Sequence, residues 1–272
     1  MKQLSLQDIK DQSLEILQDV HDFCEKNGIV YYLAAGTLLG AVRHKGYIPW
    51  DDDVDVFMLR PEYNKFISLY QSSRYELMAI ENDKDCINPY AHVVDLKRTY
   101  VKNMYYPHHR KHFGLKIDIF PLDMASDSRE EFDAQFDEML AVGQYLWKAR
   151  HANCHFDLGK PWEYNRKLFA DKRHYKNGRM ARQFVEQIDA IAQRVPWGTT
   201  QHVALQACPL KNARQYFRIE DFNERVLLDF EDRKFWAPKN YHEVLTAEFG
   251  NYMTPPPEDM RHGEHTWDIY FK

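Results

Sequence analysis

GTLLGAVRHKGYIPWDDDVDVF, residues 36–57, combines a glycine turn, a short helical pattern and a run of acids. The Gly36-Thr37 pair follows an aromatic, β-branched stretch typical of a strand, and residues 38–44 have the apolar spacing of a helix. This order predicts a strand-to-helix turn at Gly36-Thr37. Backbone N–H groups at a helix N-terminus can hold a phosphate, so we expect these two residues to contact one.

An alternating run of acids follows the turn. Side chains of a strand alternate between its faces, so Asp51, Asp53 and Asp55 would share one face while Val54 and Val56 point into the core. Carboxylates about 4 Å apart repel by roughly 4 kcal/mol at an effective dielectric constant of ~20, and a divalent cation would offset this repulsion. Oxygen ligands favour Mg²⁺, Mn²⁺ or Ca²⁺. The run therefore predicts a metal site on a strand that begins at Asp51.

A fourth acid belongs to the same prediction. Asp118 stands inside the apolar run KIDIF, where an unpaired buried charge would be costly. If this strand pairs with the one that begins at Asp51, Asp118 joins the other carboxylates. Positive charge near the turn comes from three consecutive residues, Arg43, His44 and Lys45.

Two other interpretations of the acidic run are open. Asp51, Asp53, Asp55 and Glu62 match the first, third, fifth and twelfth positions of a calcium loop, but Val56 stands where that loop needs glycine. A solvated acidic loop is the second alternative. The valines within the run favour a strand over both.

The composition excludes several classes of protein. The chain has 272 residues with 36 Lys and Arg against 41 Asp and Glu, a formal net charge of −5, so we expect no nucleic-acid partner. Its 44% of hydrophobic residues suffices for a packed core. The widely spaced cysteines indicate a reducing compartment rather than a disulfide framework. Without an apolar signal segment or a membrane-spanning run, the sequence predicts a soluble, cytoplasmic protein.

The periodicity predicts helices and strands of an α+β fold. Helices are expected at residues 5–27, 61–70, 129–150, 179–194 and 239–249. Strands are expected at residues 29–35, 51–59, 75–80, 92–96 and 115–120, with a further strand pair formed by 202–207 and 224–230. The chain becomes mostly helical near residue 125, the one boundary that the pattern indicates.

Residues 36–56 strongly resemble the signature of the LicD family, which includes bacterial phosphorylcholine transferases and is related to the fukutin-type ribitol-phosphate transferases. The resemblance continues through DIFPLD at residues 118–123 and returns in C-terminal blocks at 237–240, 249–252 and 255–261. Residues 126–220 carry little that matches.

The resemblance implies a fold and a division of the chain. Residues 1–125 would form an α+β nucleotidyltransferase-like core, a small mixed sheet flanked by helices. Residues 126–272 would form a mostly helical part packed on this core, with residues 236–272 returning to the active site. We expect acceptor specificity to reside in residues 126–220.

The resemblance also implies a reaction. A phospho-alcohol, above all phosphorylcholine, would move from a CDP-activated donor such as CDP-choline to a sugar hydroxyl of a cell-surface glycan or teichoic-acid precursor. Phosphoryl transfer depends mostly on positioning and charge neutralisation, here with Mg²⁺ or, in its place, Mn²⁺. The implied metal ligands are Asp53, Asp55 and Asp118, with Asp51 as a fourth member whose alternative role is to cap the turn.

Further residues have implied roles. Gly36 and Thr37 would hold a donor phosphate, while Arg43 and Lys45 would offset the charge of the transition state. Asp118 would either complete the metal site or act as base on the acceptor hydroxyl. Additional substrate contacts are expected from His44, Trp50, Arg261 and His265.

The resemblance also implies substrates and partners, and two rival functions stand beside it. A choline headgroup is held by aromatic rings, for which Trp50 and Trp147 are the candidates, whereas glycerol or ribitol would need polar contacts. The acceptor would be a saccharide, or a lipid-linked saccharide reached by peripheral contact at the inner face of the membrane. Two rivals stay open: a nucleotidyltransferase that moves NMP from an NTP, and a catalytically silent, metal-stabilised saccharide-binding scaffold.

Overall fold

The structure is a computed structural model that describes residues 2–101, 113–152, 154, 161–208, 214–261, 263 and 268–272. Its helices are α1 (Leu6–Asn27), α2 (Ala35–His44), α3 (Arg60–Leu69), α4 (Arg129–His151), α5 (Trp162–His174), α6 (Ala181–Ala192) and α7 (Tyr241–Phe249), with short 3-10 helices η1 (Ile219–Phe222) and η2 (Glu258–Met260). Its strands are β1 (Tyr32–Leu33), β2 (Asp55–Leu59), β3 (Glu76–Met78), β4 (Ala91–Asp95), β5 (Thr99–Val101), β6 (Leu115–Ala125), β7 (His202–Ala204), β8 (Tyr216–Arg218), β9 (Arg225–Phe230), β10 (Arg233–Pro238) and β11 (Ile269–Phe271). The helices expected at 5–27, 61–70, 129–150, 179–194 and 239–249 are confirmed to within two residues at each end.

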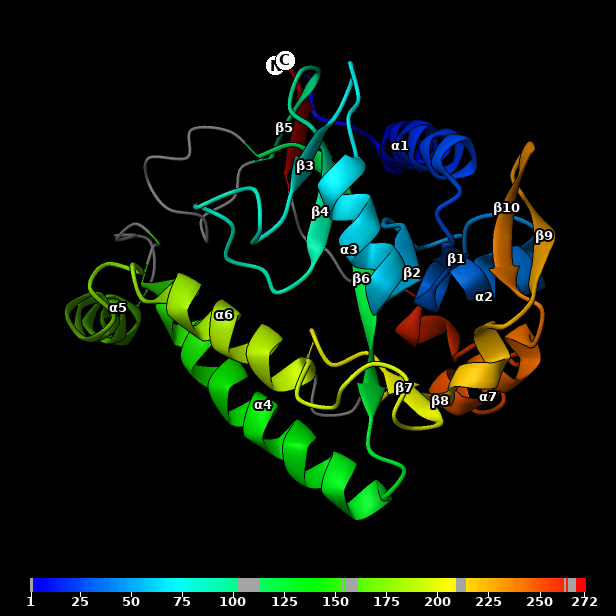
Figure 1. Ribbon diagram of the computed structural model, residues 1–272. Helices are drawn as coiled ribbons and strands as arrows, with labels where there is room; N and C mark the ends of the chain where they lie inside the picture. The colour runs from blue at the N-terminus through cyan, green and yellow to red at the C-terminus, as the bar shows by residue number, and fades with distance from the viewer. Residues whose placement is uncertain are drawn as a thin grey trace.

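A mixed sheet forms the centre of the molecule (Figure 1). Its order is β1-β2-β6-β4-β3, in which β2 and β6 run parallel and the other neighbours antiparallel. The far end of β6 pairs with β7, and β7 pairs with β8. Strands β9 and β10 form a separate pair, as do β5 and β11. The expected α+β fold, a small mixed sheet flanked by helices, is confirmed.

The core lies where α1 and α3 pack against β6. Leu17 and Val20 of α1 and Ile117 and Ile119 of β6 are fully buried in one apolar cluster. Burying each of these side chains contributes about 1.5–3 kcal/mol. Because alternate residues of a strand face opposite ways, this packing leaves Asp118 on the other face of β6.

Helices α4 and α6 lie side by side (Figure 1), and α5 packs on α4; we call α4–α6 the helical region. Arg60 at the start of α3 joins it to the sheet, since its guanidinium pairs with Asp123 of β6 at 2.6 Å and with Asp189 of α6 at 3.1 Å. The division of the chain near residue 125 stays a prediction. Among the described residues, no helix has the length and apolar character needed to cross a bilayer.

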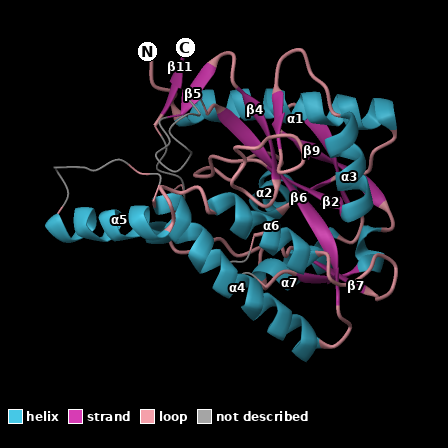
Figure 2. Ribbon diagram, turned by 60° about the vertical axis from the view of Figure 1, so that its left-hand side comes forward, coloured by secondary structure: helices cyan, strands magenta, loops and turns pink. Residues whose placement is uncertain are grey.

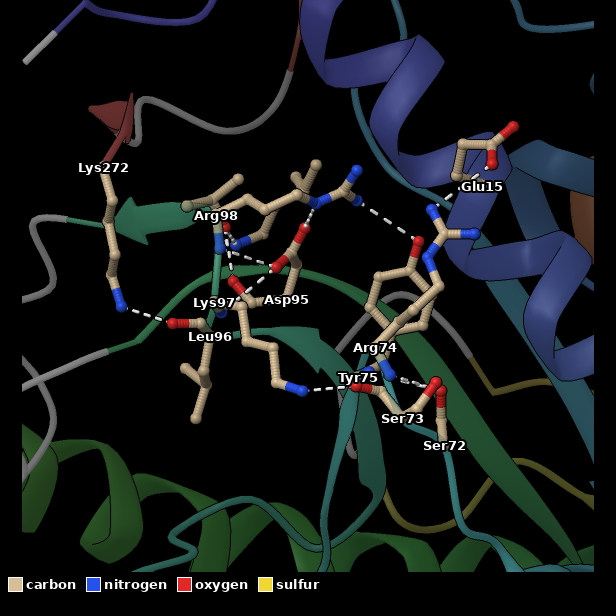
Figure 3. A network of polar contacts seen from close by, with 12 residues as sticks. Glu15, Ser72, Ser73, Arg74, Tyr75, Asp95, Leu96, Lys97, Arg98 and Lys272 are labelled. Carbon is tan, nitrogen blue, oxygen red and sulfur yellow. Dashed lines mark hydrogen bonds and ion pairs between the residues drawn. The ribbon is translucent and has the colours of Figure 1, made fainter.

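A polar network fixes the C-terminal strand to the edge of the sheet (Figure 3). Lys272, just after β11, donates to the carbonyl of Leu96. Arg98 donates to the carboxylate of Asp95 at 2.7 Å and to the Tyr75 hydroxyl at 3.3 Å. Asp95 ends β4 and Tyr75 precedes β3, so the C-terminus is held where these two strands meet.

β2 begins at Asp55, which corrects the strand expected from Asp51 onward. The chain turns before the strand, because the Asp51 N–H donates to the Ile48 carbonyl at 3.0 Å and the Lys10 ammonium binds the same carbonyl at 3.0 Å. A chain held in this turn cannot extend the ladder. Asp51 and Asp53 therefore do not share a strand face with Asp55, and the alternation argument fails for them.

The first predicted strand is also shorter than expected. The Val30 N–H donates to the Glu62 carboxylate at 2.9 Å rather than to a neighbouring strand, and Ala34 already caps α2. α2 thus starts earlier than the predicted helix, so that Gly36 and Thr37 lie in its first turn.

The strand pair expected between residues 202–207 and 224–230 is wrong. β7 pairs with β6 and β8, while β9 pairs with β10. Glu231, with φ 55°, closes the turn between β9 and β10, and its N–H donates to the Lys45 carbonyl at 2.8 Å. Local pairing across this turn therefore prevails over the distant partner.

Candidate active site

The parallel pairing of β2 and β6 brings predicted acids together. Asp55, the first residue of β2, stands opposite Asp118 in β6, and His92 of β4 stands opposite Asp118 from the other side. Figure 1 shows β6 between β2 and β4. All three side chains are buried. Polar side chains from neighbouring strands thus meet on the face of the sheet turned away from Ile117 and Ile119.

Three more carboxylates gather just before β2. Among the residues that the structure describes, Asp51, Asp52 and Asp53 offer ligand oxygens within 4.8 Å of one another. The sequence pattern predicted Asp51 and Asp53 but missed Asp52, because strand alternation would have placed the Asp52 side chain on the opposite face. These three aspartates, together with Asp55 and Asp118, are called the acidic edge below.

Crowding shifts the pKa values of the acidic edge. Burial, followed by the charge of Asp53, raises the pKa of Asp51 to about 7. Burial, followed by the charges of Asp53 and Asp118, also raises the pKa of Asp55 well above its usual value. Both shifts express the repulsion of like charges held away from water, which a divalent cation would offset. Carboxylate oxygens are the ligands that Mg²⁺ and Mn²⁺ prefer, so these residues fit such an ion.

Two cationic or proton-donating groups hold Asp118. Lys116 pairs with its Oδ1 atom, and Nδ1 of His92 lies 2.6 Å from the same oxygen. Burial alone would raise the pKa of Asp118, but Lys116 and His92 outweigh it and keep this pKa well below its usual value. Asp118 is therefore an ionised carboxylate even though it is buried.

Hydrogen bonds from Arg150 through Asn88 fix the orientation of His92. Arg150 of α4 donates to Oδ1 of Asn88, which turns the Asn88 amide nitrogen toward Nε2 of His92. Nε2 then accepts, so Nδ1 carries the proton that it donates to Asp118. Burial lowers the pKa of His92, in agreement with a neutral ring. Sequence reasoning missed Asn88, His92, Lys116 and Arg150, because only the strand register brings them to Asp118.

The strand-to-helix turn touches the acidic edge directly. Ala35 adopts φ 45°, an uncommon conformation for a residue with a side chain. A Cβ on Gly36 would lie 2.7 Å from Oδ2 of Asp51, so glycine leaves room for this carboxylate. Oγ1 of Thr37 accepts a hydrogen bond of 2.9 Å from the Asp55 N–H. The turn thus positions both Asp51 and Asp55.

A second group, basic and aromatic, lies near the end of α2. Arg43 donates from Nε to His44 at 2.9 Å and from Nη1 to the Tyr252 carbonyl at 2.7 Å. The Arg261 guanidinium lies 5.5 Å from the centre of the Trp50 ring, and the His44 ring meets Trp50 edge-on at 6.5 Å. Burial and the charge of Arg261 lower the pKa of Arg43. Three predicted substrate contacts, His44, Trp50 and Arg261, thus lie together with Arg43.

The C-terminal segment reaches the acidic edge. A Cβ on Gly263 would lie 3.2 Å from the Trp50 carbonyl oxygen and 3.5 Å from Oδ2 of Asp52. Arg261, two residues earlier, therefore approaches the same side. The predicted contact His265 lies outside the described residues.

Lys45 takes a different position from its neighbours. It ends α2 in a left-handed conformation with φ 62°, and its carbonyl accepts from Glu231 in the β9–β10 turn. Lys234 and, after it, Lys45 lower the pKa of Asp229 on β9. The Lys45 side chain is exposed and lies beside the β9–β10 hairpin, whereas Arg43 and its neighbours lie nearer the acidic edge.

A cavity of about 590 Å³ lies along α4. Its wall includes Tyr90, Trp147, Arg150 and Cys208. The Tyr90 ring lies 5.1 Å from that of His92. Arg150 in turn bonds to Asn88, which lies beside Nε2 of the same histidine. The cavity wall is therefore linked to Asp118 through His92.

Comparisons with known proteins bear on this geometry. Residues 28–139 match the family model described as LicD/FKTN/FKRP, nucleotidyltransferase domain. The chain is 29% identical over 280 residues to the lipopolysaccharide cholinephosphotransferase LicD of Haemophilus influenzae, and the match covers 99% of each chain. It is 31% identical over 116 residues to an uncharacterized protein of Rickettsia prowazekii, covering 40% of this chain and 44% of the other. The matched domain contains the turn at Gly36 and the whole acidic edge. The chain is therefore similar to proteins of the LicD family, over residues 28–139 for the family model and over nearly its full length for the Haemophilus relative.

Proposed function

We propose that the protein transfers phosphorylcholine from CDP-choline to a hydroxyl group of a cell-surface saccharide. Similarity over nearly the full length to a lipopolysaccharide cholinephosphotransferase supports both the transferred group and the class of acceptor. The observation that carries the proposal is the register of Asp55 and Asp118, which brings buried carboxylates beside the turn at Gly36-Thr37. Carboxylates beside a helix N-terminus suit a reaction at a diphosphate.

Mg²⁺ is the proposed cofactor, with Mn²⁺ able to replace it. Asp51, Asp53 and Asp55 would hold the ion, joined by Asp118 and by Asp52, which the loop places among them. When bound, the ion would neutralise charge on the diphosphate of the donor and on the leaving CMP. The raised pKa values of Asp51 and Asp55 support this assignment, because an empty cluster of carboxylates opposes its own ionisation.

The chain's own groups would orient the substrates around these acids. Arg43 and Arg261 supply guanidinium groups that suit donor phosphates on the side of Trp50. Asp118 already accepts from Lys116 and His92, so it is a weak proton acceptor. Of the two roles open to Asp118, the metal ligand is therefore favoured over the general base.

The test combines donor binding with product analysis. CDP-choline, CDP-glycerol and CDP-ribitol are titrated into the protein by calorimetry with Mg²⁺ and then with EDTA, and CMP release is measured with a lipopolysaccharide oligosaccharide as acceptor. We expect Mg²⁺-dependent binding of CDP-choline and release of CMP. Asp53→Ala should abolish CMP release and leave the melting temperature unchanged or higher, because it removes one of several crowded charges.

Asp232→Asn is the matched control, because its side chain is 80% exposed and lies at the β9–β10 turn. It should keep full activity. Retained turnover by Asp53→Ala would contradict the assignment of the acidic edge. Pyrophosphate release from CTP, without CMP release from CDP-choline, would instead establish the rival nucleotidyltransferase, and binding without turnover would favour the silent scaffold.

A further inference from the structure

Helix α5 has two faces of opposite character. Its inner face packs on the end of α4: Leu168 is fully buried, the Tyr164 ring meets that of His151 edge-on, and Asp171 lies 2.9 Å from Nδ1 of His151. Lys172 adds a hydrogen bond of 2.9 Å to the carbonyl of Ala152. These contacts fix the orientation of α5 and so decide which side chains face outward.

The outer face carries two exposed aromatic side chains interleaved with two arginines. Trp162 is 71% exposed and Phe169 is 62% exposed. Arg166 and Arg173 follow each of them by four residues, so the four lie on one side of the helix. Figure 2 shows α5 projecting from the body of the molecule beyond the end of α4.

The charge of this segment is opposite to that of the whole chain. Residues 162–179 hold six Lys and Arg against two acids, whereas the chain has a formal net charge of −5. One of the two acids, Asp171, is buried against His151 and so contributes little to the outer surface. The outer face therefore presents a local positive field around exposed aromatic rings.

We propose that the outer face of α5, formed by Trp162, Arg166, Phe169 and Arg173, docks the protein onto an anionic lipid surface. A helix that lies in a membrane interface buries Trp and Phe at the level of the headgroups, while Lys and Arg bind anionic lipids. Both features occur here on one helix face. The inference does not depend on the proposed function, because binding to lipid needs no turnover.

A protein partner fits this face less well. Protein interfaces are depleted of lysine, whereas residues 162–179 hold three lysines beside three arginines, as suits an anionic lipid surface. The position of the face also suits a lipid-linked substrate. Lys167 of α5 lies 5.4 Å from the centre of the Trp147 ring, and Trp147 lines the cavity along α4. A surface that docks at α5 would therefore lie next to this cavity.

The test is co-sedimentation of the full chain with phosphatidylcholine vesicles, with and without phosphatidylglycerol. We expect binding only to vesicles that contain phosphatidylglycerol, and we expect it to weaken as salt is added. The double variant Arg166→Gln/Arg173→Gln should bind about thirty-fold more weakly. Trp162→Ser/Phe169→Ser should also lose most of its binding to vesicles. All four side chains are exposed, so neither double variant should affect folding.

Two control variants remove positive charge or an aromatic ring elsewhere on the surface. Lys26→Gln/Lys84→Gln removes two exposed charges from α1 and from the loop after β3, and Trp197→Ser removes a tryptophan that is 41% exposed. Both should bind vesicles as the unchanged protein does. The proposal is overturned if phosphatidylglycerol does not increase the binding of the unchanged protein to vesicles. It is also overturned if the α5 variants and the controls bind vesicles equally well. Dimerisation that disappears in Trp162→Ser/Phe169→Ser without any vesicle binding would assign this face to a second copy instead.

Discussion

The acidic edge and the helical region differ in what holds their side chains in place. In the acidic edge, buried carboxylates such as Asp51 and Asp55 crowd one another, and their raised pKa values measure the repulsion. In the helical region, Val185 and Ile188 of α6 are fully buried in an apolar cluster. The difference teaches that the helical region is stabilised by its own packing, whereas the acidic edge keeps its geometry only because neighbouring elements impose it.

The largest effect is expected where the two regions are joined, at Arg60. Its side chain is 7% exposed and pairs with Asp123 at 2.6 Å and with Asp189 at 3.1 Å. Arg60→Met would leave two carboxylates near each other without their cation. Removing one partner of a buried ion pair typically lowers the free energy of unfolding by about 3–5 kcal/mol. Urea unfolding of the purified variant measures this loss.

Arg74→Met provides the comparison for Arg60→Met. Arg74 also pairs with a carboxylate, that of Glu15 at 3.4 Å, but its side chain is 47% exposed. Solvent screens such a pair, so the loss should be less than about 1 kcal/mol. Equal losses in the two variants would mean that the junction at Arg60 is not what couples the helical region to the sheet.

A smaller effect, confined to the acidic edge, is expected from His92→Gln. His92 positions Asp118 through a hydrogen bond of 2.6 Å, and its loss should lower turnover about 10- to 100-fold, as for other residues that orient metal ligands. The concentration of Mg²⁺ that gives half the maximal rate should rise at the same time. A merely structural role for His92 would lower stability and leave this concentration unchanged.

His202→Gln is the matched control for His92→Gln. Nδ1 of His202 lies 2.7 Å from Asp127, so the same kind of pair is broken, but at the far end of the sheet. The Mg²⁺ dependence of this variant should equal that of the unchanged protein. The same increase in both variants would remove the special role assigned to His92.

The sequence predicted what depends on local pattern. α1 lies between its expected cap at Ser5 and its expected end at Gly28, because a capping box and a left-handed glycine act within a few residues. Asp118 was expected beside the other acids because its apolar run made it a buried strand. The parallel register that sets it opposite Asp55 agrees with that expectation.

What the sequence could not predict depends on distant contacts. His92 stands in an ordinary apolar strand, and nothing in that strand indicates that it faces Asp118, 26 residues away. β9 pairs with β10 across a turn at Glu231 that lacks the usual glycine or asparagine, so no turn residue in the sequence predicted this hairpin. Asp52 lies in the cluster because the turn at Ile48, which Lys10 contacts, makes the strand begin only at Asp55.

The smallest effect on stability, with the sharpest meaning for the helical region, is expected from Trp147→Ser. Trp147 is 50% exposed, so the free energy of unfolding should change by no more than about 0.5 kcal/mol. If the cavity along α4 receives the acceptor, KM for a water-soluble acceptor should rise about five-fold, equivalent to about 1 kcal/mol, at unchanged affinity for CDP-choline. Tyr145→Ser, 49% exposed on the same helix and outside the cavity wall, should change neither constant. Weakened donor binding in Trp147→Ser alone would instead assign the cavity to the choline headgroup, and the helical region would then serve the donor rather than the acceptor.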